Sequence, residues 1–144
     1  MPKKPQVGGR KTGREPAYRV FVSHATGDKW IATTICEKID AVPGVATFRD
    51  DRDIGGGDDI PDTLLTELEQ SDQLLLLLTP TSITRQWVIL EVGMAVALRK
   101  RIVPVCYNAM VDQMPILSMT KAYLLNDFDS YLADLRKRVQ KGRT

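Results

Sequence analysis

Hydrophobic runs alternate with amphipathic stretches along most of the chain, and the two kinds of pattern predict strands and helices in turn. Five short runs are rich in β-branched, aromatic or leucine residues, as strands are. One of them, QLLLLLT at residues 73–79, is apolar at almost every position, which is typical of a central strand buried on both faces. The expected strands are Tyr18–Val22, Val45–Phe48, Gln73–Thr79, Ile102–Cys106 and Ala122–Leu125.

Four helices are expected between and after these strands, because their apolar residues recur every three or four positions. The first follows Asp28, a favourable N-cap residue, and ends at Pro43-Gly44. The second begins at Asp59, the third spans Thr84–Leu98 and the fourth spans Asp127–Val139. The residues expected to face the core are Ile31, Ile35, Ile39, Ile60, Leu64, Leu65, Leu68, Val88, Val92, Ala95, Val96, Phe128, Tyr131, Leu132, Leu135 and Val139.

This alternation predicts an α/β fold, a parallel sheet with helices on both faces and right-handed crossovers. For five strands the common doubly wound order is 2-1-3-4-5, as in flavodoxin-like proteins, and we expect that order here. Ligands of such sheets bind beyond the carboxyl ends of the strands, where the strand order reverses. The reversal lies between the first and third strands, so Ser23–Asp28 and Thr79–Glu91 are the segments expected to form a site.

Length and charge indicate one folded domain with a basic leader. The chain has 144 residues, close to the usual size of a single domain. Its net charge of +2 divides into +5 over residues 1–14 and −3 over the rest. We expect residues 1–16 to be a disordered tail, 17–140 to be the domain and 141–144 to be a second disordered tail. A solvated leader is the simpler interpretation of the first tail, and binding of nucleic acid is not favoured.

Several classes of protein are excluded by what the sequence lacks. Cys36 and Cys106 are far apart and form no CxxC pair, and with one histidine they indicate no metal site. The acidic loop at residues 51–62 lacks the bidentate glutamate of a calcium loop. Neither a GxGxxG nor a P-loop motif is present. No apolar run approaches the roughly 20 residues of a membrane helix, so we expect a cytoplasmic protein with reduced thiols.

Segments at the expected strand ends resemble the sequence boxes of TIR (Toll/interleukin receptor) domains. YRVFVSHA at 18–25 resembles the first box in its bacterial form, and FRDDRDIGGGDDI at 48–60 resembles the second box with its BB loop. Ser82 followed by Trp87-Val-Ile-Leu-Glu91 resembles the serine and WxxxE motif of catalytic members, and RIVPV at 101–105 resembles the fourth strand. The resemblance covers residues 17–139. The chain departs from many relatives at Val88, where they have cysteine, and in the BB loop, where three glycines replace Pro-Gly.

The resemblance implies an enzyme that cleaves the nicotinamide–ribose bond of NAD⁺. NAD⁺ would be its substrate, and no cofactor is expected. The products would be nicotinamide and either ADP-ribose or a cyclic ADP-ribose isomer, in bacterial antiphage signalling of the Thoeris kind or in other immune signalling. Departing nicotinamide is neutral and is a good leaving group, so the species that requires stabilisation is the oxocarbenium-like ribosyl cation. A carboxylate stabilises such a cation in glycoside hydrolysis. Glu91 is the expected catalytic carboxylate.

Six further residues are expected to bind the substrate. Trp87, one helical turn before Glu91, would stack on the nicotinamide or adenine ring. Arginines in or beside the BB loop would meet the diphosphate, and hydroxyls and the histidine would meet ribose or phosphate. Three of them have a simpler alternative: Trp87 as a core residue, Ser82 as a helix-start cap and His24 as a hydrogen-bonded strand end. The alternative for Glu91 is an acid at the solvent edge of its helix. The six residues are Ser23, His24, Arg49, Arg52, Ser82 and Trp87.

The resemblance also suggests partners and alternatives. Catalytic TIR domains work as assemblies, so we expect a homo-oligomer held by TIR–TIR contacts, with low activity as a monomer. A separate effector protein would be reached through the product, and no membrane partner is expected. The main alternative is a non-enzymatic TIR–TIR interaction module, which Glu91 disfavours. A nucleoside hydrolase or deoxyribosyltransferase has a similar sheet with a carboxylate at the ribose, but the BB-loop pattern favours TIR.

Overall fold

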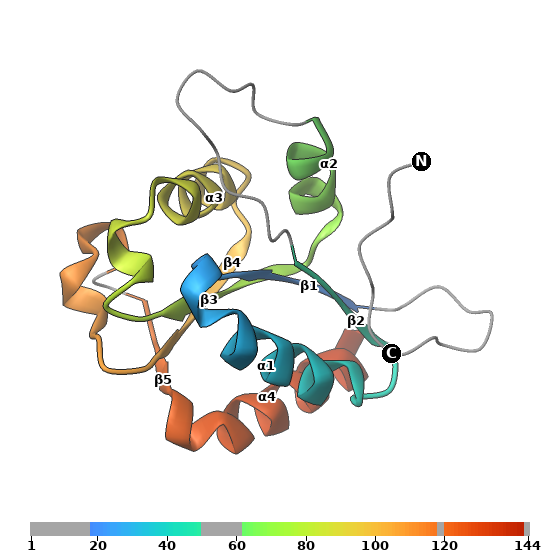
Figure 1. Cartoon of the computed structure of the whole chain (residues 1–144). Coiled ribbons are helices and arrows are strands. Elements are labelled where there is room, and N and C mark those ends of the chain that lie inside the picture. The colour runs from blue at the N-terminus through green and yellow to red at the C-terminus, as the bar shows by residue number, and fades with distance from the viewer. Residues whose placement is uncertain (1–17, 50–61, 118–119, 143–144) are drawn as a thin grey trace.

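The computed structural model describes residues 18–49, 62–117 and 120–142 of the chain. All strand pairs in these segments are parallel, and they form one five-stranded sheet with the order β2-β1-β3-β4-β5. This confirms the predicted fold class and strand order (Figure 1). The main elements are β1 (Tyr18–Ser23), α1 (Lys29–Asp40), β2 (Val45–Phe48), α2 (Asp62–Gln70), β3 (Gln73–Leu78), α3 (Gln86–Ala97), β4 (Arg101–Cys106), β5 (Tyr123–Leu124) and α4 (Phe128–Gly142).

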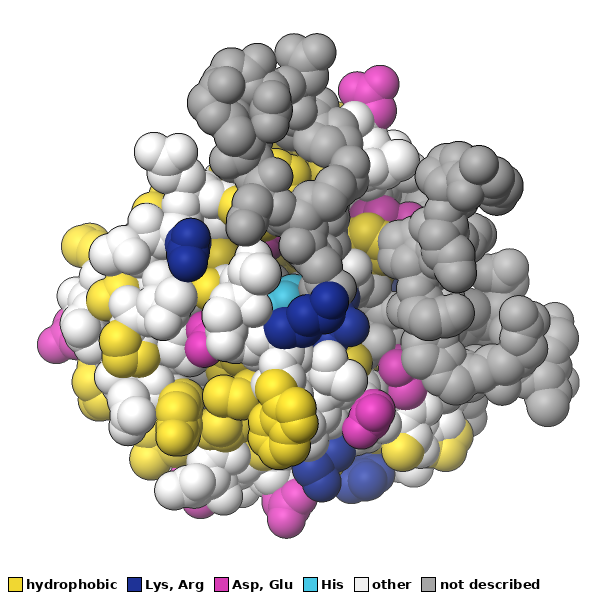
Figure 2. Space-filling view, viewed as in Figure 1, with side chains coloured by type: hydrophobic (Ala, Val, Ile, Leu, Met, Phe, Trp, Pro, Cys, Tyr) yellow, Lys and Arg dark blue, Asp and Glu magenta, His cyan; other side chains and the backbone are white. Residues whose placement is uncertain are grey.

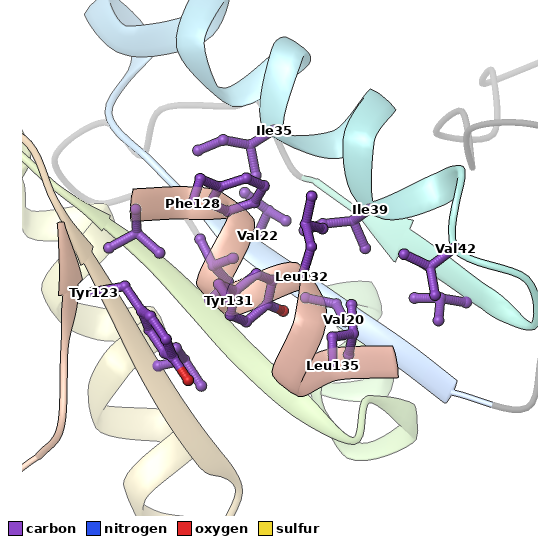
Figure 3. Packing of buried hydrophobic residues seen from close by; sticks show 14 of the residues in the cluster. Val20, Val22, Ile35, Ile39, Val42, Tyr123, Phe128, Tyr131, Leu132 and Leu135 are labelled. Atoms are coloured by element: carbon purple, nitrogen blue, oxygen red, sulfur yellow. The ribbon is translucent and has the colours of Figure 1, made fainter. Parts of the chain in front are cut away.

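The helices form two layers, with α1 and α4 on one face of the sheet and α2 and α3 on the other (Figure 1). Successive strand residues point to opposite faces, so each strand contributes to both layers. In β1, Val20 and Val22 pack with α1 and α4, whereas Phe21 packs with α2 and α3. Figure 3 shows the first of these cores, in which Ile35 and Ile39 of α1 meet aromatic and leucine side chains of α4. Every residue of β3 is buried, as its leucine run predicts.

Two helices differ from the sequence prediction in which residues face the core. Val96 is 43% exposed and Leu65 is 41% exposed, although both were expected to be buried. At about 100° per residue, the buried face of α3 covers an arc of about 140°, and Val96 falls beyond its edge. Leu65 is likewise about 100° away from Leu64, which does face the sheet. The prediction that these two residues are buried, which rested on their apolar character, is therefore wrong.

Some element boundaries also differ from the predicted ones. The stretch before α3 begins with a separate 3₁₀ turn at Ser82–Thr84, so the α-helix itself starts at Gln86. At the other end of the chain, α4 continues to Gly142, which is two residues into the predicted C-terminal tail. The predicted N-terminal tail and the start of the second helix at Asp59 lie outside the described residues. No helix within residues 18–49, 62–117 and 120–142 has both the length and the apolar character needed to cross a bilayer.

Candidate functional site

Glu91 of α3 is buried and is hydrogen-bonded to Ser23, the last residue of β1. The Ser23 hydroxyl donates a hydrogen bond to Glu91 Oε1 at 2.5 Å, and each residue is only 1% exposed. Ser23 is the last residue of β1 and lies two positions after Phe21, so it points to the same face, towards α3. The strand order reverses between β1 and β3, and this contact lies where β1 ends. The structure thus brings two predicted site residues together at the predicted place.

Glu91 is the only acidic side chain of α3, and it lies on the buried face of that apolar helix. Gln86 and Glu91 are its only polar side chains, and Glu91 shares the buried face with Trp87, Val88 and Val92. Burying a charged carboxylate costs several kcal/mol unless hydrogen bonds compensate, so stability alone does not favour an acid there. Ionisable groups in such environments gather at functional sites. The burial therefore supports a chemical role for Glu91 over the alternative of a solvent-edge residue.

Trp87 is buried one turn before Glu91 and belongs to the hydrophobic cluster between α3 and the sheet. Its neighbours there include Phe21 of β1 and Leu78 of β3. The indole N–H meets no hydrogen-bond acceptor within the described part of the chain. Trp87 therefore serves as a core residue that also lies beside the candidate carboxylate, as the spacing of four residues on one helix requires.

The loops that follow β1 and β3 are joined by a small hydrogen-bond network. The Thr79 hydroxyl donates to Asp28 Oδ2 at 2.6 Å and accepts from the Ser82 amide at 3.0 Å. In return, Ser82 Oγ accepts from the Thr79 amide at 2.9 Å and donates to the Leu77 carbonyl at 2.8 Å. The network fixes the turn that leads into α3. The Ser82 hydroxyl is thus bonded to the backbone, and its predicted contact with substrate would require it to leave these partners.

The sequence did not reveal two members of this network. Asp28 was interpreted as the N-cap of α1, and it does precede that helix, but its side chain makes no capping hydrogen bond there. Its carboxylate instead reaches the loop after β3. The sequence predicts Thr79 as a strand end and as the start of a site segment, but it predicts no partner for the Thr79 hydroxyl. The Thr-x-x-Ser spacing from Thr79 to Ser82 is a signal that was available, since hydroxyl side chains three residues apart bond to each other's backbone in turns.

Ser82→Ala is expected to lower the free energy of unfolding by about 1–3 kcal/mol, because the buried Thr79 amide would lose its acceptor. Urea unfolding followed by circular dichroism measures the change. Ser130→Ala, an exposed serine of α4, is the matched control and should change stability by no more than about 0.5 kcal/mol. Equal effects of the two substitutions would mean that the turn before α3 does not depend on this hydroxyl.

Two of the remaining predicted residues, Arg49 and His24, follow strands at the same edge. Arg49 follows β2 and is half-buried, and its Nη1 donates to Thr33 Oγ1 of α1 at 2.5 Å. His24 follows β1 directly and is buried, and Figure 2 shows this single histidine in cyan beside side chains of Lys or Arg type. Arg52 lies outside the described residues. Among the segments that the structure describes, no three His, Cys, Asp or Glu side chains are grouped as ligands of a metal ion.

The fold is similar to solved TIR structures. The TIR domain of the Toll-related Receptor TRR-2 from Hydra magnipapillata matches with a TM-score of 0.64 at 18% identity, covering 87% of this chain and 98% of that one. The TIR domains of the activated Roq1 resistosome match with a TM-score of 0.56 at 19% identity, covering 88% and 79%. A metazoan TIR-STING receptor from C. gigas matches with a TM-score of 0.61 at 23% identity, covering 91% of this chain and 43% of that receptor.

Sequence comparison supports the same assignment. None of the curated protein sequences matches this chain. The sequence model of the TIR domain, however, matches residues 20–139, which is most of the chain and includes all five strands of the sheet except the first two residues of β1. The resemblance seen in the boxes at residues 18–25 and 48–60 therefore reflects membership, and the chain belongs to the TIR domain family.

Proposed function

We propose that this TIR domain cleaves the nicotinamide–ribose bond of NAD⁺ as a glycohydrolase or cyclase, with Glu91 as the catalytic residue. The main support is the Glu91 carboxylate, which is buried at the end of β1, where doubly wound sheets bind their ligands, and is held there by Ser23. Burial of a carboxylate costs stability, and such buried acids are typical of functional sites. Stabilisation of a cationic transition state is a role that a buried carboxylate can fill.

The bond that breaks joins C1 of the ribose to the pyridinium nitrogen. Its electron pair leaves with nicotinamide, which becomes neutral, and positive charge develops on the ribose. A carboxylate in a water-poor site interacts with that charge far more strongly than one in water does. Attack by water then gives ADP-ribose and a proton. Attack by a ring nitrogen or hydroxyl of the same molecule gives a cyclic isomer and likewise releases a proton when the attacking group carries one.

Other groups at this edge suit the rest of the substrate. His24 follows β1 and Arg49 follows β2, the strand next to β1, so both follow strands at the edge where Ser23 meets Glu91. A diphosphate favours arginine partners because guanidinium donates paired hydrogen bonds. Binding to substrate by Arg49 would require its contact with Thr33 to be shared or broken. We propose the same phosphate-binding role for Arg52, and we assign Trp87 to the wall of the ring-binding site.

The active form is proposed to be an assembly of copies in the cytoplasm. One similar structure is a resistosome that contains TIR domains, and another is a receptor that joins TIR to STING. TIR–TIR contacts that complete the site would make cleavage dependent on protein concentration. A product of NAD⁺ cleavage would then act on a separate effector protein in immune signalling.

Product analysis tests this function directly. The protein is incubated with NAD⁺ at dilute and at high concentration, and nicotinamide, ADP-ribose and cyclic isomers are resolved by chromatography. We expect nicotinamide to appear, with a rate per molecule that rises with protein concentration, and the second product distinguishes hydrolysis from cyclisation. Absence of nicotinamide from self-associated protein would favour an interaction module, whereas release of base from simple nucleosides would favour a nucleoside hydrolase.

A further inference from the structure

We infer that Ser23 is a positioning residue for Glu91, and that it is not a ligand of the substrate. The inference rests on the proposed function for its kinetic consequences, although the contact itself is structural. A serine hydroxyl has one proton to donate, and here it is donated to Glu91 Oε1 at 2.5 Å, between two side chains that are both almost fully buried. A phosphate oxygen, which only accepts, would have to compete with this charge-assisted bond for the same proton. A ribose hydroxyl could donate to the lone pairs of Ser23 Oγ, but the side chain is only 1% exposed, which limits that access.

The backbone of Ser23 is fixed, which makes its side chain a suitable anchor. Residues Val20–Ser23 pair with Gln73–Leu76 of β3, and Tyr18–Phe21 pair with β2 on the other side. A serine side chain has one torsion between the backbone and its oxygen, so the position of Oγ follows closely from the strand. Glutamate has three such torsions and loses more freedom when it is held. The oxygen of Ser23, whose position is set by the strand, therefore holds the Glu91 side chain in one conformation.

The same hydrogen bond favours the charged form of the carboxylate. A donor aimed at a carboxylate stabilises the ion over the neutral acid, and burial acts in the opposite direction. The neighbours of Glu91 on the buried face of α3 are Trp87, Val88 and Val92, and none of these side chains carries a charge. Ser23 thus has two effects that a reaction through a cation needs: it orients the acid, and its donated bond favours the ionised form over the neutral one.

Among the described residues, the other titratable groups that follow the strands at this edge include His24, Asp28, Arg49, Cys106 and Tyr107, and none of them is substituted in a Ser23 variant. Burial raises the pKa of the Cys106 thiol, so this group stays neutral near neutral pH. A shift of pH dependence that Ser23→Ala shows and Ser71→Ala does not is therefore the shift expected from loss of the bond to Glu91.

The kinetic test compares Ser23→Ala and Ser23→Thr with Ser71→Ala. Ser71 is the matched control, since it is also buried and donates a short bond, but to the Glu67 carbonyl beside the start of β3. Ser23→Ala should lower kcat for nicotinamide release about 10- to 100-fold, with KM for NAD⁺ within about twofold. The acid limb of its kcat–pH profile should move to higher pH. Ser23→Thr should recover most of the rate, and Ser71→Ala should change neither quantity. A raised KM with unchanged kcat would instead make Ser23 a substrate ligand and overturn the inference.

A second measurement does not depend on activity. The carboxyl ¹³C signal of Glu91, assigned by its loss in Glu91→Gln, is titrated in the wild-type protein, Ser23→Ala and Ser71→Ala. We expect the titration midpoint to move to higher pH in Ser23→Ala alone. An unchanged midpoint in folded Ser23→Ala would overturn the inference even in a protein that releases no nicotinamide. A shifted midpoint without any NAD⁺ cleavage by the wild type would refute the proposed function and leave the positioning role in place.

Discussion

Glu91→Gln is expected to reduce nicotinamide release at least about 100-fold while leaving the fold as stable as the wild type or more stable. The amide has nearly the same volume as the acid, and its oxygen can still accept the Ser23 hydrogen bond. It carries no charge, so it cannot stabilise the ribosyl cation. Loss of one preorganised electrostatic partner commonly costs 10²- to 10³-fold in kcat. Steady-state kinetics with NAD⁺ measures the loss.

Stability distinguishes a functional acid from a structural one. A buried charge is costly, so its neutral isostere should raise or preserve the free energy of unfolding. Glu69→Gln on α2 is the control, because Glu69 is exposed, and it should affect neither rate nor stability appreciably. A Glu91→Gln variant that keeps its activity would indicate that Glu91 has no part in catalysis, and one destabilised by several kcal/mol would indicate that the acid supports the fold.

The fold was accessible from the sequence because burial leaves a pattern in each strand. The five consecutive leucines of β3 predict a strand buried on both faces, and that strand occupies the centre of the sheet. The alternation of strands with helices then leaves few topologies, and the observed order is the common one. The errors concern residues at the edges of the buried helix faces. Whether Val96 or Leu65 is covered depends on how far the neighbouring layer extends, which their own hydrophobicity does not reveal.

The partners within the site were not accessible in the same way. Ser23 and Glu91 are 68 residues apart, and Thr79 and Asp28 are 51 apart, so each contact depends on the packing of α3 and the loops against β1. The sequence predicts both Ser23 and Glu91 at the edge where the structure brings them together, but it predicts no contact between them. Only the observed direction of the hydroxyl shows that its proton is used inside the protein.

A second polar network lies at the opposite edge of the sheet, where the strands begin. The Tyr131 hydroxyl of α4 donates to Gln73 Oε1 at 2.6 Å, and Gln73 Nε2 donates to the Tyr18 hydroxyl at 2.9 Å. Tyr131 is enclosed by other aromatic rings, including Phe128 and Tyr123, as Figure 3 shows. Burial is the main cause that raises the pKa of Tyr131 far above its usual range, and it also raises the pKa of Tyr18.

Alkaline pH should therefore destabilise the protein through Tyr131. Below about pH 10 the tyrosine is protonated in both the folded and the unfolded chain, and its contribution to stability is complete. Above that pH the unfolded chain loses the proton while the folded protein keeps it, because the folded pKa is raised. The free energy of unfolding should then fall by up to about 1.4 kcal/mol per pH unit from this group. Urea unfolding at several pH values between 8 and 11.5 measures the slope.

Tyr131→Phe isolates this effect. At pH 8 the variant should be less stable by about 1–3 kcal/mol, because buried Gln73 Oε1 loses its donor. The deficit should shrink above pH 10, since phenylalanine has no proton to lose and the wild type alone is weakened there. Tyr107→Phe, at an exposed position, should show no such convergence. Because the network lies at the edge away from Glu91, Tyr131→Phe should also leave cleavage of NAD⁺ near neutral pH unchanged. Parallel stability curves for Tyr131→Phe and the wild type would show that the buried hydroxyl ionises as readily in the folded protein as in the unfolded chain.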